Sequence, residues 1–457
     1  MRILHAIHDF LPRHQAGSEI YAFELCRAQR PSHDVTVLCA DFDPSRAHGT
    51  VDWRVHRGVP VVEIVNNWVC GSFEETYRPP LVRDRIAHVL RALQPDVVHV
   101  HNLQNLSFDL PAMARANGAR VVATLHDYTL VCASGGQRIH RADRYVCRTI
   151  DTDRCARCFR ESIFFAHMSL GRIAAATNRP GLLMTAARAA RRWFPALSGT
   201  AARAAASLPL MTVTRADIDA RLVAARRLMD DVDVFVAPSK SVAEEYCALG
   251  LPASKLRVSD YGFPPLREGT GARRSSRPLR IGFIGTLVWH KGAHVLIDAV
   301  RGLPADAYEL TVFGDPDVFP DYAAGLRAQA AGLPVRFAGA VQRERIADAY
   351  AQIDLLVVPS LWLENSPLVI HEAFMARVPV VAARIGGIAG LITDGVNGLL
   401  YDSDQPREAS VERSLRAVLA ELIARFERLD ALAAAAPPVK SIDQDAREWD
   451  AIYAEVA

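Results

Sequence analysis

The chain has 457 residues, of which half are hydrophobic and 23% are charged. At roughly 150 residues per domain this length corresponds to about three domains or two large ones, so a sizeable core is expected and overall disorder is excluded. Lys and Arg total 53 against 51 Asp and Glu, which gives a formal net charge of +2. This balance excludes a globally basic nucleic-acid binder.

The N-terminal run MRILHAIHDFLP is interrupted by His5, His8 and Asp9, and no small-residue cleavage site follows it. We therefore expect no secretory signal. No stretch approaches the ~18 uninterrupted apolar residues of a spanning helix, so membrane contact is expected only at the surface. Eight cysteines are too few for a disulfide scaffold. A cytoplasmic protein is expected, with any membrane contact at the inner face.

The first half of the chain alternates short β-rich runs with helical patterns. The runs are RILHAI, DVTVLCA, DVVHVHN, ARVVATLHD and DVFVAPS. This alternation predicts a parallel sheet wrapped by helices, in a domain over residues 1–260. His99 and His101 alternate on one run and should point to the same face. His126 follows the next run beside Asp127, where a hydrogen-bonded structural histidine is the plain interpretation.

A cysteine cluster interrupts this domain over residues 132–158. Its thiols end in a C-x-x-C pair, and they belong to Cys132, Cys147, Cys155 and Cys158. Four thiols in a polar segment are typical of a tetrahedral structural zinc site. An iron–sulfur cluster stays open because thiols alone do not select the metal, and disulfides or uncoordinated thiols are the plain alternative. We expect a structural clip rather than a catalytic ion.

A helical insertion is predicted over about 160–225. Residues 160–210 are rich in arginine, carry aromatic side chains and have Glu161 as their one acidic residue. Such a surface could lie on an anionic bilayer. Alanine-rich helices that pack on the first domain with their arginines exposed fit the pattern equally well.

A segment rich in Gly, Pro, Ser and Arg, from Arg257 to Pro278, predicts an interdomain linker. The strand–helix alternation then restarts and predicts a second α/β domain over 276–430. Residues 431–457 are expected to form a helical segment that returns to the first domain. In two such sheets facing across a cleft, ligands bind beyond the carboxyl ends of the strands.

The first strand-to-helix turn of the second half reads GTLVWHKG, from Gly285 to Gly292. Its glycines permit close backbone approach, and Lys291 places a cation where a phosphate would meet a helix N-terminus. The spacing of the glycines matches neither a G-x-x-x-x-G-K-[ST] loop nor a G-x-G-x-x-G fingerprint. The sequence therefore does not favour a kinase or an oxidoreductase. An exposed lysine in an ordinary turn is the plain alternative.

A later turn carries two carboxylates, Glu364 in the loop and Glu372 in the helix that opens near Pro367. Carboxylates accept hydrogen bonds from paired hydroxyls, so one could hold a sugar and the other a ribose. Two glutamates at this spacing are weak evidence alone, but their place after the strand DLLVVPS strengthens it. The Gly386–Gly387 pair could bring backbone amides close to a ligand.

Taken in order, these turns resemble the retaining family-4 glycosyltransferases. The run VPSLWLENSPLVIHEAFMARVPVVAARIGGIAGLITDGVNGLLY resembles that family's donor-binding region, and GTLVWHKG resembles its diphosphate loop. The turn at Gly17 and the run VVATLHD resemble its first half. The resemblance covers most of the chain outside about 160–225. The chain also resembles a subgroup of this family that bears similar cysteine clusters.

This resemblance implies the GT-B fold: two Rossmann-like, doubly wound α/β domains facing across a cleft. It also implies roles for single residues. Gly17, Gly285, Thr286, Lys291, Asn365, Ser366, Pro367, Leu368 and Glu372 would bind the donor. Within that set Lys291 would hold the diphosphate and Glu372 the ribose. Glu364 and His126 would act at the transferred sugar. The chain departs from the family pattern at Thr286, usually arginine, and at Gly390, usually glutamate.

The sequence therefore predicts a glycosyltransferase that moves a sugar from a nucleotide-diphosphate sugar to a glycan or lipid-linked acceptor. Polysaccharide or glycoconjugate assembly is the expected setting, and no nucleic-acid partner is expected. Two alternatives stay open. One is a nucleotide-sugar epimerase or hydrolase. The other is a donor-binding scaffold without transfer activity, which the departures at Thr286 and Gly390 suggest.

Overall fold

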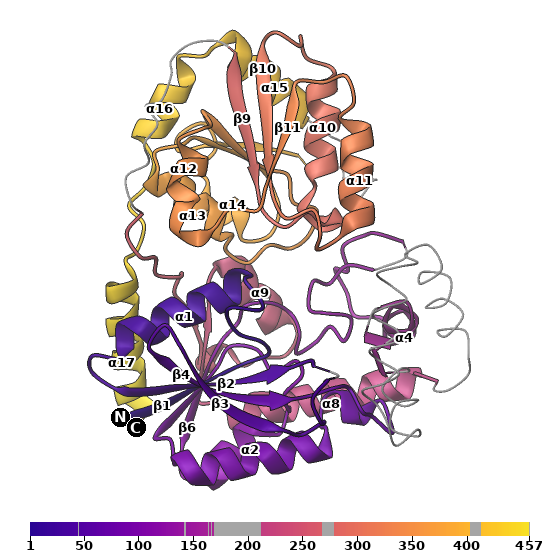
Figure 1. Cartoon of the computed structure of the whole chain (residues 1–457), viewed down its shortest axis with the longest axis vertical. Helices are drawn as coiled ribbons and strands as arrows, with labels where there is room; N and C mark the ends of the chain where they lie inside the picture. Colours follow the sequence, from indigo (N-terminus) through magenta and orange to yellow (C-terminus); the bar gives the residue numbers. More distant parts are fainter. Residues whose placement is uncertain are drawn as a thin grey trace. The chain divides into compact units, whose positions relative to one another are not determined.

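The computed structural model describes residues 1–43, 45–140, 143–162, 164–165, 167–168, 212–266, 278–402 and 413–456. The chain folds into two compact units (Figure 1). Unit 1 contains Met1–Pro238, Ala243–Gly262 and Ile442–Ala457, and unit 2 contains Ser239–Val242 and Phe263–Ser441.

Unit 1 is built on an eight-stranded sheet of order β3-β4-β2-β1-β5-β6-β7-β8. All neighbours are parallel except the β3–β4 hairpin at one edge. The strands are β1 (Arg2–Ile7), β2 (Asp34–Asp41), β3 (Val51–His56), β4 (Val59–Val65), β5 (Val97–Val100), β6 (Arg120–Thr124), β7 (Val234–Ala237) and β8 (Leu256–Val258). The central strands are buried throughout, as parallel strands covered on both faces must be.

Helices cover this sheet on both faces. α1 packs with α17, whereas α3 packs with α2 and α8. The helices are α1 (Gly17–Gln29), α2 (Pro80–Leu93), α3 (Leu110–Ala116), α4 (Thr152–Arg160), α8 (Arg215–Asp231), α9 (Lys240–Ala248) and α17 (Ile442–Val456). α8 begins at a capping box, in which the Thr214 side chain and Asp217 satisfy each other's backbone amides.

Unit 2 is built on a six-stranded parallel sheet of order β11-β10-β9-β12-β13-β14. The strands are β9 (Leu279–Ile284), β10 (Tyr308–Phe313), β11 (Val335–Gly339), β12 (Leu355–Val358), β13 (Val380–Ala383) and β14 (Leu399–Tyr401). The helices are α10 (Ala293–Arg301), α11 (Pro320–Gln329), α12 (Ile346–Tyr350), α13 (Leu368–Met375), α14 (Ile388–Leu391), α15 (Leu415–Ala424) and α16 (Arg428–Ala434). In chain order the strands follow the 3-2-1-4-5-6 pattern of a doubly wound sheet.

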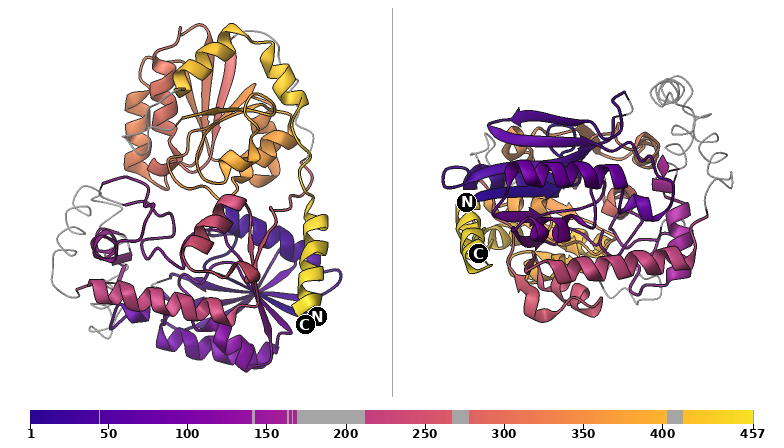
Figure 2. Two further views of the ribbon diagram at one scale, coloured as in Figure 1. Left: turned by 180° about the vertical axis from the view of Figure 1, so that it is seen from behind. Right: turned by 90° about the horizontal axis from the view of Figure 1, so that it is seen from below.

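The C-terminal helix α17 belongs to unit 1, where it lies beside α1 (Figure 2). Trp449 donates its indole N–H to the hydroxyl of Tyr21, 2.9 Å away, and Tyr21 donates to Asp445. The preceding helix α16 belongs to unit 2. The segment that rejoins unit 1 therefore starts at Ile442 rather than at 431, because the apolar face of α16 is buried in unit 2.

Most of the predicted arginine-rich surface, from 169 to 210, lies outside the described residues, as do residues 267–277 of the predicted linker. Within the described residues, no helix combines the length and the apolar character that crossing a bilayer requires.

Candidate functional site

The strand order of unit 2 reverses between β9 and β12. At such a switch point the helices after the two strands lie on opposite faces, which leaves a crevice beyond the carboxyl ends. The loop after β9 carries Lys291 in the short 3-10 turn Trp289–Lys291, and the loop after β12 carries Glu364. The sequence-predicted donor residues of unit 2 thus belong to these two loops and to helix α13, which follows the second loop.

Lys291 and Glu364 form an ion pair, with 2.6 Å between Nζ and Oε1. The Ser360 hydroxyl donates to the same oxygen over 2.6 Å. Glu364 is buried, whereas the lysine side chain is 29% exposed and its ammonium lies 5.2 Å from the ring centroid of Trp362. Two residues that are 73 positions apart in sequence therefore meet in one polar cluster, with a cation that solvent reaches.

Glu372 lies on α13 and is held by a different set of partners. Arg343 forms an ion pair with Oε1, and the hydroxyl of Tyr350 donates to Oε2 over 3.1 Å. The carboxylate is buried, at 2% exposure. Sequence reasoning missed Arg343 and Tyr350 because the segment RERIADAYAQ carries only the pattern of an ordinary helix.

The loop before α13 supplies the remaining predicted donor residues of this turn. Asn365 and Ser366 are buried, and the Ser366 hydroxyl lies 2.8 Å from Nε2 of His371. Pro367 is the N-cap of α13 and Leu368 its first residue, so this loop leads directly into a helix N-terminus. Backbone amides at such a position favour negatively charged groups.

Close backbone approaches fix both loops. Gly292 has φ 76°, and a Cβ there would lie 1.8 Å from the carbonyl oxygen of Pro359. A Cβ on Gly387 would lie 1.7 Å from the carbonyl oxygen of Asn365, while the Gly387 amide donates to the carbonyl of Glu364 over 2.6 Å. A side chain at Gly292 would push the Lys291 loop away from the loop after β12, and a side chain at Gly387 would push the loop after β13 away from Asn365.

Gly285 and Thr286 follow β9 directly. The Gly285 amide donates to the carbonyl of Phe313 on the neighbouring strand over 3.1 Å, and Thr286 is exposed. A Cβ on Gly314 would lie 2.4 Å from the carbonyl oxygen of Gly285, so the backbone of the next loop passes close by. Thr286 thus presents a hydroxyl to solvent at the position where the family pattern has a guanidinium.

His126 follows β6 in unit 1 and is buried, at 8% exposure, with a polar partner at each ring nitrogen. Its Nε2 lies 2.9 Å from Nδ1 of His101, and its Nδ1 lies 2.8 Å from the hydroxyl of Tyr261. Burial lowers the pKa of His126 to about 3. The imidazole is therefore neutral near pH 7, and both of its ring nitrogens are engaged within unit 1.

The hydrogen bonds continue from His101 through His5 to Gln29, which the sequence did not indicate. His101 Nε2 lies 3.0 Å from His5 Nδ1, and His5 Nε2 lies 3.0 Å from the side-chain oxygen of Gln29. Because that oxygen can only accept, His5 must carry its proton on Nε2. Each following imidazole is then fixed in the same tautomer, and Tyr261 donates at the far end of this histidine chain.

His99 lies beside the histidine chain, with its ring centroid 4.2 Å from that of His101. It bonds Thr124 and Tyr453, each over 2.8 Å. Burial lowers the pKa of His99 and of His101 well below the usual range. His99 on β5 and His101 just after it place their rings side by side, as their alternation predicts.

Gly17 is the first residue of α1, in unit 1, and it is exposed. Two residues further along, Glu19 is completely buried, and His8 and His14 on the loop after β1 approach it. Coulombic attraction from His8 and the contact with His14 outweigh burial and lower the pKa of Glu19 to about 2.

The four clustered cysteines lie in one neighbourhood of unit 1. Cys155 and Cys158 are on α4, and Cys147 donates its amide to the carbonyl of Arg138 over 2.7 Å. Burial, followed by the charges of Cys132, Cys147 and Cys158, raises the pKa of Cys155 to about 12. All four are free thiols rather than disulfides. Zinc or an iron–sulfur cluster at these thiols stays a prediction.

Two protein-family models match the chain. Residues 16–159 match Glycosyltransferase Family 4, and residues 278–419 match Glycosyl transferases group 1. The first match covers Gly17, His126 and the cysteine cluster, and the second covers Lys291, Glu364 and Glu372. Each of the two units thus carries one glycosyltransferase-family domain.

Among curated proteins, the chain is 31% identical to the D-inositol 3-phosphate glycosyltransferase of Xylanimonas cellulosilytica, over 41% of this chain and 49% of that one. It is 28% identical to the amylovoran biosynthesis glycosyltransferase AmsK of Erwinia amylovora, over 38% and 45%. The chain thus spans about half the length of these curated relatives.

Among solved structures, the chain resembles Anabaena Alr3699/HepE in complex with UDP and glucose, with TM-score 0.64 and 17% identity over 99% of both chains. The expected fold of two Rossmann-like α/β domains of GT-B type is confirmed. Together with the two family models, this fold supports a family-4 glycosyltransferase.

Proposed function

We propose that this chain, a GT-B protein with a family 4 and a group 1 glycosyltransferase domain, transfers a sugar from a nucleotide-diphosphate sugar to a glycan or lipid-linked acceptor. Assembly of a cell-surface polysaccharide or glycoconjugate is the proposed setting. The observation that carries the proposal is the Lys291–Glu364 pair at the switch point of unit 2. The structural relative named with UDP and glucose supports a nucleotide-sugar donor.

Transfer breaks the bond between the anomeric carbon and the diphosphate oxygen, and its electron pair leaves with the diphosphate. Lys291 and the amides that open α13 stabilise this growing negative charge without needing a catalytic metal. We propose retention of configuration by front-face attack. The acceptor hydroxyl oxygen then forms the new bond, and its proton passes to the leaving phosphate.

The two carboxylates take different roles in this proposal. Glu364 holds hydroxyls of the transferred sugar, beside the cation that grips the diphosphate. Glu372 holds the ribose, with Arg343 and Tyr350 fixing the orientation of its carboxylate. His126 meets the sugar as a neutral group, because the pKa of about 3 leaves it uncharged at neutral pH.

The decisive experiment compares Lys291→Met with Arg345→Met. Lys291→Met should weaken UDP-glucose binding at least ten-fold, about 1.4 kcal/mol, because it removes the charge-assisted contact to the diphosphate. Arg345 is a matched control, since its substitution removes one cation of unit 2 from a side chain that is 72% exposed. A thermal-shift screen of nucleotide sugars first identifies the donor. Titration calorimetry then measures the donor affinity of both variants. Equal affinity in wild type and Lys291→Met would remove Lys291 from the diphosphate site.

Turnover of the chosen donor then separates the alternatives. Sugar attached to material of a membrane extract supports transfer. Free sugar released without acceptor supports a hydrolase, and a changed donor sugar supports an epimerase. Tight binding without any of these supports the scaffold, the alternative suggested by Thr286 and Gly390.

A further inference from the structure

The loop after β1 and the first turn of α1 bring two imidazoles and one carboxylate together. Nε2 of His8 lies 3.1 Å from Oε1 of Glu19, and Nδ1 of His14 lies 3.2 Å from the same oxygen. The three atoms all lie within 4.8 Å of one another. This cluster is at the switch point of unit 1, where the strand order reverses between β1 and β5.

The carboxylate of this cluster is in an unusual setting. Glu19 has no exposed surface, and neither of its oxygens has a hydrogen-bond partner within the described residues. In that part of the chain its ion pairs are with His8 and His14, and no Lys or Arg joins them. A buried carboxylate without hydrogen bonds is costly unless a cation compensates it.

The spacing of the three atoms is compatible with a shared cation. Both imidazole nitrogens approach Glu19 closely, yet neither contact has the alignment of a hydrogen bond. Ligands at about 2.0–2.2 Å from a tetrahedral zinc ion lie roughly 3.3–3.6 Å from one another. The two separations from Glu19 fall slightly below this spacing, and the His8 and His14 nitrogens lie within 4.8 Å of each other, so a small adjustment brings all three atoms around one ion.

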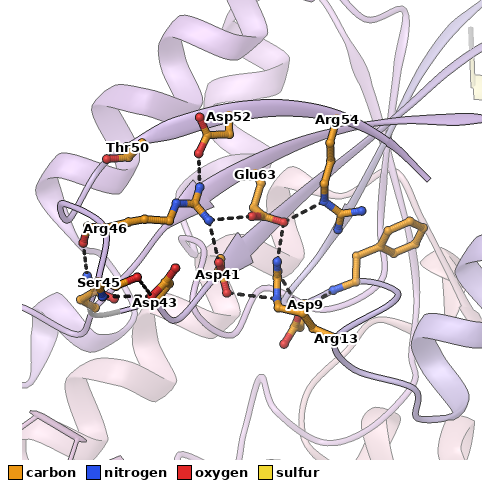
Figure 3. Close-up of polar contacts among 12 residues, drawn as sticks. Asp9, Arg13, Asp41, Asp43, Ser45, Arg46, Thr50, Asp52, Arg54 and Glu63 are labelled. Carbon is orange, nitrogen blue, oxygen red and sulfur yellow. Dashed lines mark hydrogen bonds and ion pairs between the residues drawn. The ribbon is translucent and has the colours of Figure 1, made fainter. Parts of the chain in front are cut away.

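Arg13 lies on the loop that carries the two histidines, and Figure 3 shows its carboxylate partners. Its guanidinium lies 2.7 Å from Glu63 on β4, 3.1 Å from Asp41 on β2 and 3.3 Å from Asp9. Glu63 is also paired with Arg46 and Arg54. The backbone between His8 and His14 is therefore anchored to the sheet, which is the support that a preorganised ligand set requires.

Solvent can reach the cluster from one side. The His14 side chain is half exposed, whereas that of His8 is 17% exposed and Glu19 is buried. Three protein ligands with one open side leave a position for water, as in zinc sites that have three protein ligands.

We propose that His8, His14 and Glu19 form a binding site for one divalent transition-metal ion of the zinc type. Two imidazoles and one carboxylate suit zinc, cobalt and iron(II) and do not suit magnesium or calcium, which prefer oxygen ligands. The ion ties the loop after β1 to the start of α1, on either side of Gly17. Sugar transfer as proposed above does not pass through it, so the two proposals stand or fall separately.

Cobalt(II) titration of chelator-treated full-length protein tests the site. Cobalt bound by nitrogen and oxygen shows weak visible bands without the thiolate charge-transfer band that the cysteine cluster would give. We expect one equivalent of thiolate-free cobalt in a variant carrying Cys155→Ser and Cys158→Ser. His14→Gln should weaken its binding at least ten-fold, and Glu19→Gln should abolish it.

The control is Glu24→Gln, which removes a carboxylate of the same helix that pairs with Arg27 instead. It should bind cobalt as the parent does. Because His14 is half exposed, its variant should fold even if Glu19→Gln does not. Zinc should also raise the melting temperature of the parent and not that of His14→Gln. Absence of a thiolate-free signal, or equal cobalt affinity in His14→Gln, would overturn the proposal.

Discussion

At the scale of single residues, the loops around Lys291 and Glu364 depend on positions that have no side chain. Gly387 donates its amide to the carbonyl of Glu364 and faces the carbonyl oxygen of Asn365. Gly390 lies three residues later on α14, and a Cβ there would meet no heavy atom of the described residues within 4 Å. The two glycines therefore differ in steric surroundings although they lie within the same short segment.

Gly387→Ala should destabilise unit 2 by about 2–4 kcal/mol and weaken nucleotide-sugar binding, because its methyl would collide with the backbone of Asn365. Gly390→Ala is the matched control and should be neutral or slightly stabilising, since alanine is favoured over glycine in a helix. Urea unfolding and UDP-glucose affinity check both. Equal stability of the two variants would contradict the steric argument.

At the scale of elements, the ends of β1, β5 and β6 place buried histidines side by side. Burial lowers the pKa of His5 to about 4 and of His126 to about 3, against an ordinary 6.5. Between those values and 6.5 the unfolded chain binds more protons than the folded chain. Folding stability is therefore fully present above about pH 6.5 and falls as the pH drops toward the folded values.

Unit 1 should thus lose stability on acidification, with up to about 1.4 kcal/mol per pH unit for each buried histidine. His99→Gln should reduce this slope because it removes one group whose pKa is lowered by burial. His88→Gln, at an exposed position on α2, should leave the slope unchanged. Urea unfolding between pH 7.5 and 5 measures it, and a stability that rises on acidification would refute the assignment.

The sequence was informative where function and local pattern coincide. The order of β-rich runs predicted both parallel sheets, and the turns after β9 and β12 predicted the loops that bring Lys291 and Glu364 together. The sequence did not predict the role of Arg343, because that role depends on a contact with Glu372, 29 positions away, which no local spacing encodes. The histidine chain was not predicted for the same reason, since Gln29 and His5 meet only when α1 folds onto β1.

At the scale of the whole molecule, the chain leaves unit 1 after Gly262 and returns to it at Ile442. α17 then contributes Trp449 to the core of unit 1, where its ring lies 4.1 Å from that of His99. The sequence predicted a returning segment, but its start depends on whether α16 or α17 docks on unit 1. Only the packing decides between them.

Trp449→Ala should destabilise unit 1 by about 3–5 kcal/mol, the usual cost of truncating a buried tryptophan, and leave unit 2 unchanged. Hydrogen exchange should accelerate in β1 and β5, although both strands are far from Trp449 in sequence, and not in β12 or β13. Arg447→Ala, exposed on the same helix, is the control. Faster exchange confined to unit 2 would show that α17 does not belong to unit 1.

The two junctions that bound residues 263–441 also meet each other. Phe263 donates its amide to the carbonyl of Lys440 over 2.9 Å, and Phe263 forms a bridge with Ser441. Residues 263–441 therefore begin and end at the same place in the structure. Grafting residues 263–441 from a relative would require two junctions that lie side by side, so most of unit 2 could be exchanged while residues 1–262 and 442–457 stay unchanged.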